Sequence, residues 1–337
     1  MVFLADYASF LLKAFTVVIA VIVVMVSLFA LRKRRGKIGS LKVTRLNEFY
    51  SKLEGALDDT LLSAEQLKAQ KKAKKTSNPQ AHQDKRRVFV LDFNGDVAAT
   101  AVNQMRHEVT ALLSKATPQD EVVLRLESGG GTVHGYGLAS SHLIRIREAG
   151  IPLTVCVDKV AASGGYMMAS IANQIISAPF AILGSIGVVS QMPNFNRLLK
   201  KHDIDVELIT AGDYKRTLTI VGENTDAGRQ KYQEELSVVH ELFKAHVSKY
   251  REVVDIEKVS TGEAWFGLSA LDFKLVDRLQ TSDEYLCDQA KSSDIIHLAY
   301  QDPKKRGMKH ALGSAAASIV DRALMTLWTR LSQHKGY

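Results

Sequence analysis

Residues 153–172 decide the fold, and they read LTVCVDKVAASGGYMMASIA. The apolar run 153–157 predicts a buried strand, and the apolar run 164–172 predicts a helix. Ser163 stands at the turn between them, beside the free N–H groups and the positive end of the helix dipole. A serine in this position predicts a hydroxyl nucleophile once a base can take its proton. An ordinary helix N-cap is the alternative.

Strands and helices alternate around this stretch. Strands are expected at 88–93, 122–126 and 175–178, and helices at 99–113, 135–149 and 229–250, with a further helix and strand over 269–279. A strand-to-strand spacing of about thirty residues is typical of βαβ units and a parallel sheet. Ligands bind at the carboxyl ends of such strands. The glycine-rich turns 129–131 and 164–165 both follow strands, so we expect them to share one site.

The 337 residues divide into four segments in our interpretation. They are a membrane anchor with a basic flank at 1–38, an amphipathic helical region and polar linker at 39–86, the main folded domain at 87–285, and a C-terminal extension at 286–337. Helical spacing of apolar residues runs over about 41–70 and again over 312–331. The second of these amphipathic helices could pack against another subunit or lie on a membrane.

The N-terminal segment 14–31 contains no charged residue, and Lys13 and Arg32 close its ends. A helix of this length spans roughly 27 Å, close to the thickness of a bilayer core. A cleaved signal peptide is the rival interpretation, but the apolar run is long for one and no Ala-x-Ala site follows. We therefore expect a single transmembrane helix that contacts lipid through residues 14–31.

The formal net charge is +8, and three basic clusters lie before residue 88. They flank the apolar segment or lie in the polar linker, so a membrane surface explains them better than nucleic acid, for which no motif is present. The cluster Arg32–Arg35 follows the apolar segment, which by the positive-inside rule places the main domain in the cytoplasm.

Cysteine and histidine show no metal-binding pattern. Cys156 and Cys287 are isolated, and Cys156 lies in the predicted strand, where it reads as a small core residue. The ten histidines lack the spacing of a metal motif. We expect neither a metal nor a cofactor.

Lys215 is the candidate base for Ser163. A lysine accepts a proton only when it is neutral, so its pKa of ~10.4 must fall by roughly three units through desolvation. The apolar run 208–210 before Lys215 indicates a strand that leads into a dry pocket, whereas Asp213 and Arg216 argue for solvent. A Ser–His–Asp triad with His134 or His142 is also open.

An acyl-transfer site also needs donors for the developing oxyanion, and backbone N–H groups of glycine leave room for one. Gly130 and Gly164 are the candidates, one from each glycine-rich turn. The turn 129–131 is not a P-loop, because no Gly-Lys-Ser/Thr follows it.

Four motifs occur in order: Ser128-Gly129-Gly130-Gly131, Ala162-Ser163-Gly164-Gly165-Tyr166, Gly184-Ser185-Ile186-Gly187-Val188 and Gly212-Asp213-Tyr214-Lys215. This set resembles the signal peptide peptidase A (protease IV) family, and the anchor with its long basic preamble is most similar to the SohB branch. The motifs cover about 88–280.

The resemblance implies an α/β fold with a crotonase/ClpP-like core of repeated β-β-α turns over 87–285, an N-terminal transmembrane helix, helical extensions and a homo-oligomeric ring. It implies a dyad of Ser163 as nucleophile and Lys215 as general base, with Ser185 orienting the lysine and Gly130 and Gly164 as oxyanion donors. The implied activity is a membrane-anchored serine endopeptidase that degrades signal-peptide remnants or other hydrophobic membrane-associated peptides.

Two features depart from the family pattern. The turn usually reads Asn-Ser-Pro-Gly-Gly-Gly, and here it reads Leu126-Glu127-Ser128-Gly129-Gly130-Gly131. Ser128 takes the place of the proline, which we expect to alter substrate pairing more than catalysis. Relatives usually hold the catalytic domain outside the cytoplasm, at the inner membrane of bacteria, whereas the flanking charges here favour the cytoplasm. A large domain can translocate despite such charges, so the resemblance leads us to expect the catalytic domain in the periplasm.

Two other functions compete with the peptidase hypothesis. One is a catalytically silent scaffold in membrane quality control, and the other is an acyl-CoA enzyme of the crotonase fold. The acyl-CoA enzyme explains neither an anchor nor a serine at a Gly-Gly turn, and retention of Ser163, Lys215 and both glycines favours catalysis over the scaffold.

Overall fold

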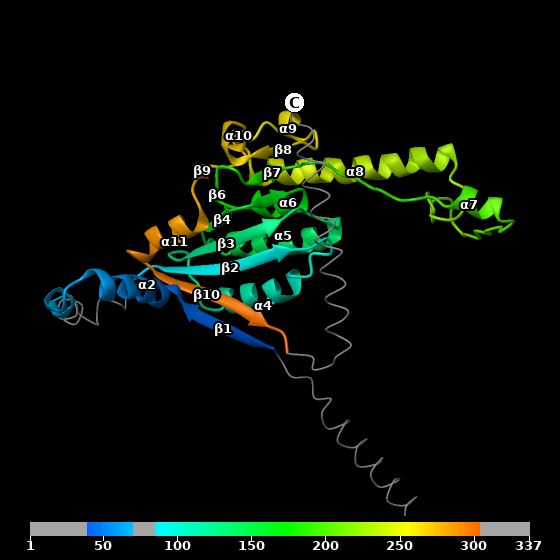
Figure 1. Ribbon diagram of the computed structural model, residues 1–337. Helices are drawn as coiled ribbons and strands as arrows, with labels where there is room; N and C mark the ends of the chain where they lie inside the picture. The colour runs from blue at the N-terminus through cyan, green and yellow to red at the C-terminus, as the bar shows by residue number, and fades with distance from the viewer. Residues whose placement is uncertain (1–38, 70–84, 304–337) are drawn as a thin grey trace, which may run out of the picture. The chain divides into compact units, whose positions relative to one another are not determined.

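A mostly parallel sheet carries the core of the computed structural model (Figure 1), which describes residues 39–69 and 85–303. We describe the compact unit from Leu41 to Tyr300. Its strands are β1 (Ser40–Arg45), β2 (Arg87–Gly95), β3 (Glu121–Ser128), β4 (Leu153–Val157), β5 (Val160–Ala162), β6 (Gln174–Ser177), β7 (Ile182–Gly184), β8 (Ala264–Phe266), β9 (Arg278–Leu279) and β10 (Asp294–Gln301). The main order is β1-β10-β2-β3-β4-β6-β9, while β5 pairs with β3 and β7, and β8 pairs antiparallel with β7.

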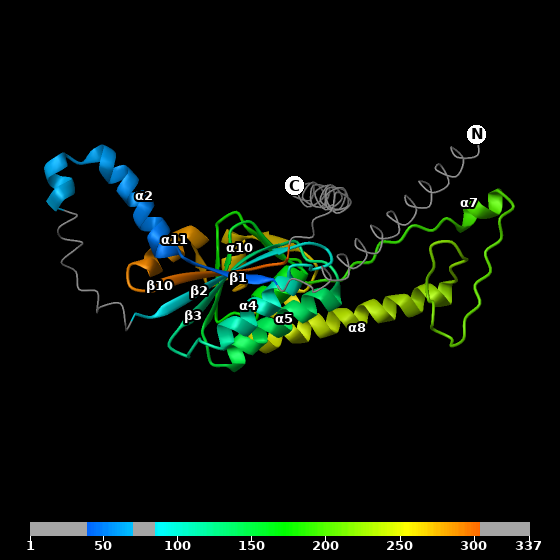
Figure 2. The same cartoon turned by 90° about the horizontal axis from the view of Figure 1, so that it is seen from below.

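Helices cover both faces of the sheet (Figures 1 and 2). They are α2 (Leu46–Leu61), α4 (Val102–Leu113), α5 (Val133–Glu148), α6 (Gly164–Ala169), α7 (Asn196–Lys201), α8 (Asp226–Tyr250), α9 (Ile256–Val259), α10 (Gly267–Asp272) and α11 (Ser282–Ala290). Along β2, Phe89, Leu91 and Phe93 join the large apolar cluster with α4 and α5, whereas Val88 and Val90 join a second cluster with α11. This alternation follows from the two-residue period of a strand and explains why the strands are apolar on both faces.

The predicted βαβ pattern is confirmed in the centre of the chain. β4 spans 153–157 as expected, and β2, β3 and β6 extend or shift the predicted strands by one or two residues. The mixed α/β class of the prediction is therefore confirmed.

The flanks of this core differ from the prediction. Residues 41–45 form strand β1 and not helix, and the helical prediction holds only from Leu46. The expected boundary at 285 falls within α11, and β10 lies between β1 and β2, although no strand was predicted there. Strands β1 and β10 are each stabilised by a partner strand that is distant in sequence, and a local sequence pattern cannot predict such pairing.

The first helix of this unit, α2, is amphipathic as predicted, but only part of its apolar surface is covered. Leu46 and Tyr50 pack against the second apolar cluster. Its other large apolar side chains are exposed: Phe49, Leu53, Leu57 and Leu61.

Helix α8 and the segment before it form an arm that leads away from the sheet (Figures 1 and 2). Near its C-terminal end, α8 buries Phe243 and Val247, and the side chain of His246 lies with Nε2 3.0 Å from Met167 O. Towards its N-terminus, Tyr232 Oη lies 2.6 Å from Ser190 Oγ of the outgoing segment. We call residues 189–242 the arm.

The predicted transmembrane helix over 14–31 and the amphipathic segment 312–331 lie outside the described residues. Among the helices that are described, none combines the length and apolar character needed to cross a bilayer.

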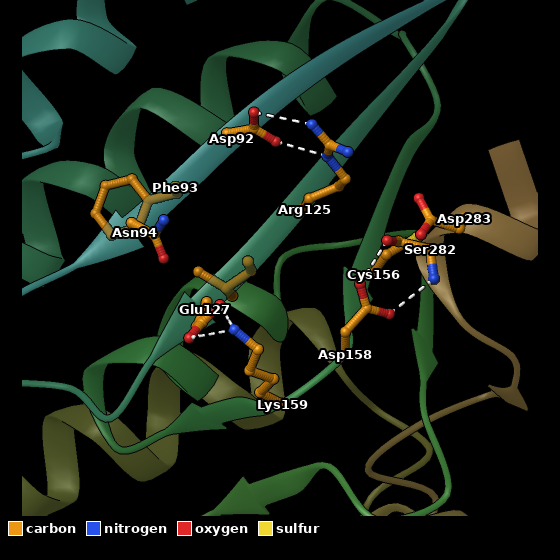
Figure 3. Close-up of a pocket in the computed structure, with 11 residues that line it drawn as sticks. Asp92, Phe93, Asn94, Arg125, Glu127, Cys156, Asp158, Lys159, Ser282 and Asp283 are labelled. Carbon is orange, nitrogen blue, oxygen red and sulfur yellow. Dashed lines mark hydrogen bonds and ion pairs between the residues drawn. The ribbon is translucent and has the colours of Figure 1, made fainter. Parts of the chain in front are cut away.

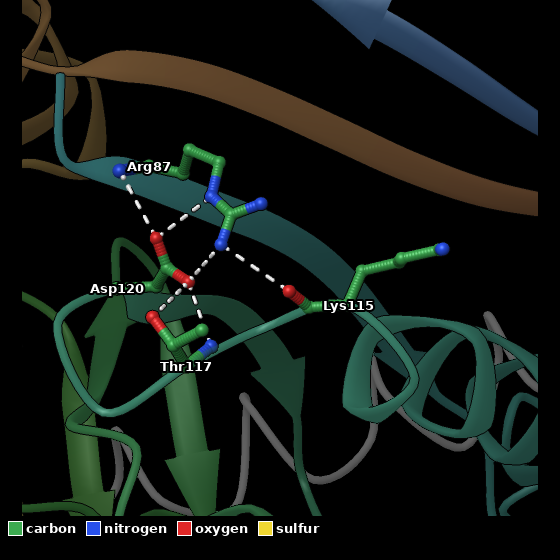
Figure 4. A network of polar contacts seen from close by, with 4 residues as sticks. All are labelled: Arg87, Lys115, Thr117 and Asp120. Atoms are coloured by element: carbon green, nitrogen blue, oxygen red, sulfur yellow. Dashed lines mark hydrogen bonds and ion pairs between the residues drawn. The ribbon is translucent and has the colours of Figure 1, made fainter. Parts of the chain in front are cut away.

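A buried carboxylate fixes the loop between α4 and β3 (Figure 4). Asp120 is almost fully buried and accepts hydrogen bonds from Arg87 Nε at 2.9 Å and from the Thr117 N–H at 2.7 Å. Burial opposes ionisation of this carboxyl, but the hydrogen bonds from Arg87 and Thr117 outweigh it and lower its pKa. The charged form therefore stabilises the fold.

We predict that Asp120→Asn lowers the free energy of unfolding by about 2 kcal/mol at pH 7, the usual scale for a hydrogen bond to a charged group. Because the folded pKa lies below that of an unfolded aspartate, this contribution is present above pH of about 4 and declines as the pH falls further. Urea unfolding at pH 7 and at lower pH measures both effects.

The matched control is Glu223→Gln, which removes an exposed ion pair with Lys200 and should leave the free energy of unfolding nearly unchanged. Equal losses in the two variants would contradict the role of Asp120.

Candidate active site

Ser163 has a strained backbone. Its φ is 52° and its ψ is −121°, in a region that residues with a side chain rarely adopt. The residue is held there by the parallel pairing of β5 with β7 and by its N–H, which donates to Gly184 O at 2.8 Å. Its side chain makes no capping hydrogen bond to α6. Ser163 thus occupies the N-cap position of α6, but its hydroxyl does not cap the helix, so capping does not account for this side chain.

The two glycine-rich turns meet at Ser163, as expected for turns that follow neighbouring parallel strands. The second turn follows β5, a short strand that was not predicted. A Cβ added to Gly130 would lie 2.7 Å from Gly164 N and 2.7 Å from Ser163 Cβ. Gly130 also has a φ of 91°, which favours glycine. Backbone of both turns therefore borders the serine. The Gly130 N–H donates to Ser128 Oγ at 3.0 Å in this structure.

Ser185 lies level with Ser163 on the neighbouring strand, because Ala162 pairs with Gly184 in the parallel register. It too has a positive φ, of 50°, and its N–H donates to Glu263 O at 2.6 Å. The structure therefore brings together Ser163, Ser185 and the two glycines.

Lys215 lies in the arm and is exposed. The ring of its neighbour Tyr214 makes a cation–π contact with Lys231 of α8, whose Nζ lies 5.0 Å from the ring centre. Lys231 precedes His246, the residue that reaches α6, by fifteen positions, or about 22 Å of helix. The predicted strand over 208–210 is absent: Leu208 and Ile209 are exposed in a segment without regular structure. Within the part of the chain that the structure describes, Lys215 therefore lies in solvent and not in a dry pocket.

The histidine alternatives are not assembled. His134 is exposed on the first turn of α5, and the ring of His142 lies 3.3 Å from an Arg145 nitrogen. Burial and two nearby arginines lower the pKa of His142. Neither histidine has a hydrogen bond to Ser163 in the parts of the chain that the structure covers.

The structure places Cys156 in the core and describes most of the residues of the types that could bind a metal. Cys156 is buried in β4 as predicted, and burial raises its pKa, so it stays a thiol. Over residues 39–69 and 85–303, no cluster of His, Cys, Asp or Glu could hold a metal.

A polar cavity of about 310 Å³ opens near the carboxyl ends of β2, β3 and β4 (Figure 3). Two ion pairs lie in it, Arg125 with Asp92 and Lys159 with Glu127, and Asp158 accepts hydrogen bonds from Ser282. Burial opposes ionisation of Asp92, but hydrogen bonds from His297 and Arg125 lower its pKa to about 2. Ser163 does not line this cavity, and its paired charges suit a structural role better than binding of an apolar peptide.

Two residues near the site were not predicted. Ser128 and Tyr136 are fully buried, and their hydroxyl groups are in contact beneath the first glycine-rich turn. The sequence signal was a tyrosine between glycines, Gly135-Tyr136-Gly137, on a helix that starts directly after the turn.

A strained serine beside glycine backbone, at the carboxyl ends of a parallel sheet, defines the class as a serine-type hydrolase. The comparison with protein families agrees. Residues 2–143 match the description "Peptidase family S49 N-terminal", and residues 145–295 match "Peptidase family S49". The chain belongs to peptidase family S49, so the expectation of a serine-type peptidase is confirmed.

Curated relatives cover nearly the whole chain. "Probable protease SohB" of Haemophilus influenzae is 44% identical over 88% of this chain and 89% of its own length. "Probable protease SohB" of Buchnera aphidicola subsp. Acyrthosiphon pisum is 48% identical over 90% of this chain and 91% of its own length. "Protease 4" of Haemophilus influenzae is 27% identical, over 52% of this chain and 29% of its own length. The predicted SohB-type resemblance is therefore confirmed.

We predict that Gly164→Ala destabilises the fold by about 2–3 kcal/mol, because its Cβ would overlap the Tyr136 ring in a packed core. Chemical denaturation measures the change, and peptidase activity should fall with it.

Gly137→Ala, on the same helix as Tyr136, is the matched control. No atom lies within 4 Å of its added Cβ, so helix propensity should raise stability by about 0.5–1 kcal/mol. Loss of stability in both variants would show that the tight packing is not specific to Gly164.

Proposed function

We propose that this protein is a membrane-anchored serine endopeptidase with Ser163 as nucleophile and Lys215 as general base. The observation that carries the proposal is the strained backbone of Ser163, held by β7 with the hydroxyl uncommitted to the helix. Strain of this kind costs of order 1–3 kcal/mol and persists where function requires it. A silent scaffold has no need of it.

The core resembles a crotonase/ClpP-like fold, and we propose that it is one. Support comes from the repeated order of one long and one short strand: β4 is followed by β5, and β6 is followed by β7. The short strands pair with each other and form a second row beside the main sheet. In such a fold, a nucleophile that directly follows a short strand would face the interior of the repeated β-β-α turn.

The dyad is proposed to form between two copies of the chain. Within one chain, the arm holds Lys215 near the N-terminal part of α8, some turns of helix from α6. A lysine that is exposed to water lacks the dry surroundings that a neutral general base requires. A neighbouring copy whose arm reaches Ser163 would supply both the lysine and the desolvation that lowers its pKa.

The arm has the surface that such an assembly needs. Large apolar side chains are exposed along it, which is unusual for a surface that remains in water. They include Leu198, Leu208, Ile209, Val238 and Leu242. A homo-oligomeric ring would bury them, and in it Ser185, level with Ser163, would orient the incoming lysine.

Gly130 and Gly164 are proposed as oxyanion donors, since backbone of both borders Ser163. The proposed substrates are hydrophobic peptides at the membrane, such as signal-peptide remnants, reached from an anchor at 14–31 in a bacterial inner membrane. No cofactor is needed for this chemistry. The side of the membrane that holds the domain is best determined by cysteine accessibility at a site engineered near residue 80.

We predict that Ser163→Ala and Lys215→Ala each lower kcat by about 10³-fold or more on a hydrophobic peptide. Lys215→Arg should be equally inactive, because arginine does not release its proton at neutral pH. The assay uses full-length, detergent-solubilised protein, with a fluorophosphonate probe to identify the reactive serine. Equal turnover in all variants, or labelling of another serine, would exclude the dyad, and an inert wild type would favour the scaffold.

Mixing the two inactive alanine variants tests assembly between copies. If Ser163 and Lys215 come from different chains, co-assembled Ser163→Ala and Lys215→Ala subunits form some intact sites, and activity returns. Each variant mixed with itself is the control. A dyad formed within one chain predicts no recovery, provided that sequential affinity purification of two differently tagged variants confirms mixed oligomers.

A further inference from the structure

Tyr136 contacts both glycine-rich turns at once. Its ring lies against Gly164, so closely that a Cβ there would overlap it. Its hydroxyl contacts Ser128 Oγ, at the start of the first turn. The side chain is fully buried on α5, and it packs edge-on against Phe93 of β2. One residue therefore sets the separation between the two turns that border Ser163.

The hydroxyl groups form a chain with one direction. Tyr136 Oη donates to Asp96 O at 2.8 Å, and a tyrosine hydroxyl has only one hydrogen to give. In its contact with Tyr136, Ser128 must then be the donor, which leaves a lone pair of Ser128 Oγ to accept the Gly130 N–H. The order is Gly130 N–H, Ser128 hydroxyl, Tyr136 hydroxyl, Asp96 carbonyl.

This chain fixes the orientation of the first turn. Without this chain, the backbone peptide group of Gly130 would be loosely held, because glycine has wide conformational freedom and the proline usual in this turn is missing here. A buried hydroxyl pair with every hydrogen bond satisfied is rigid, whereas one deprived of a partner is not. The turn is thus held from below by Tyr136 and on one side by Gly164.

We propose that Tyr136, acting through Ser128, is the positioning residue of the oxyanion site. It holds the backbone of Gly130 at a set distance from Gly164 and Ser163. The Gly130 N–H, which donates to Ser128 Oγ in this structure, would then be shared with the developing oxyanion in a three-centre hydrogen bond, beside the Gly164 N–H. Tyr136 touches neither substrate nor nucleophile. This inference rests on the proposed function, since it assumes that Ser163 forms a tetrahedral intermediate.

The test is Tyr136→Phe, which keeps the ring beneath Gly164 and removes the hydroxyl. We expect kcat on a hydrophobic peptide to fall about tenfold with KM changed less than twofold, a smaller loss than the roughly 10²–10³ for deleting an oxyanion donor. Ser128→Ala should give a similar loss, and the double variant should lose little more, because both act in one chain of hydrogen bonds.

A pair of inhibitors separates positioning from a general structural effect. A hydrophobic peptide aldehyde forms an oxyanion with Ser163, whereas the corresponding peptide alcohol binds without one. In Tyr136→Phe, affinity for the aldehyde should fall by the same factor as kcat, and affinity for the alcohol should stay within about twofold. Equal losses for both compounds would overturn the proposal.

Tyr166→Phe is the matched control, because Tyr166 is also fully buried and its hydroxyl donates to a backbone carbonyl, that of Leu275 at 2.9 Å. It should leave kcat and both affinities unchanged, and an equal loss there would overturn the proposal. If Tyr136→Phe does not fold, Ser128→Ala carries the same test. Activity that depends on Ser163 but is unaffected by these variants refutes the inference alone, whereas wild type without such activity refutes the proposed function.

Discussion

The close approach of two backbones at Ser163 is the constraint on which the rest of the site depends. Gly130 and Gly164 can lie in contact only because neither has a side chain. That contact requires β3 and β5 to end at the same level, which the parallel register of Ser128 with Ala161 ensures. The strain at Ser163 is then sustained by β7, whose Gly184 carbonyl accepts the serine N–H. Sheet topology therefore determines the geometry of the nucleophile.

In our proposal, the arm is the reason why the peptidase core needs a second copy of the chain. Its own stabilising contacts are local: Asn194 donates to Thr219 O, and Lys200 pairs with Glu223. Only the C-terminal end of α8 is buried in the core. Since Lys215 is presented on this projecting element, activity in our account depends on assembly, and an isolated subunit would hold a strained but unactivated serine. Such an arrangement would restrict proteolysis to the assembled enzyme.

Local sequence signals predicted what depends on local structure. The continuous apolar run of β4 and the Ser-Gly-Gly turn need no distant partner to be recognised, and the shared edge of both turns follows from parallel strands. Strand β10 was missed because its pairing with β2 joins residues some two hundred positions apart. The position of Lys215 could not be predicted either. The apolar run before it has the same sequence pattern whether it packs in its own core or against a neighbouring subunit. Tyr136 was missed because a buried hydroxyl shows its partners only in three dimensions.

The most direct test of the central claim is a cross-link from position 215. A photoreactive benzoylphenylalanine replaces Lys215 in isotopically labelled chains, which are co-assembled in detergent with unlabelled chains of natural sequence, irradiated and analysed by mass spectrometry. Our account predicts that labelled position 215 becomes joined to the unlabelled segment around Ser163 and Ser185. Cross-links confined to α8 of the same chain, near Lys231, would contradict it.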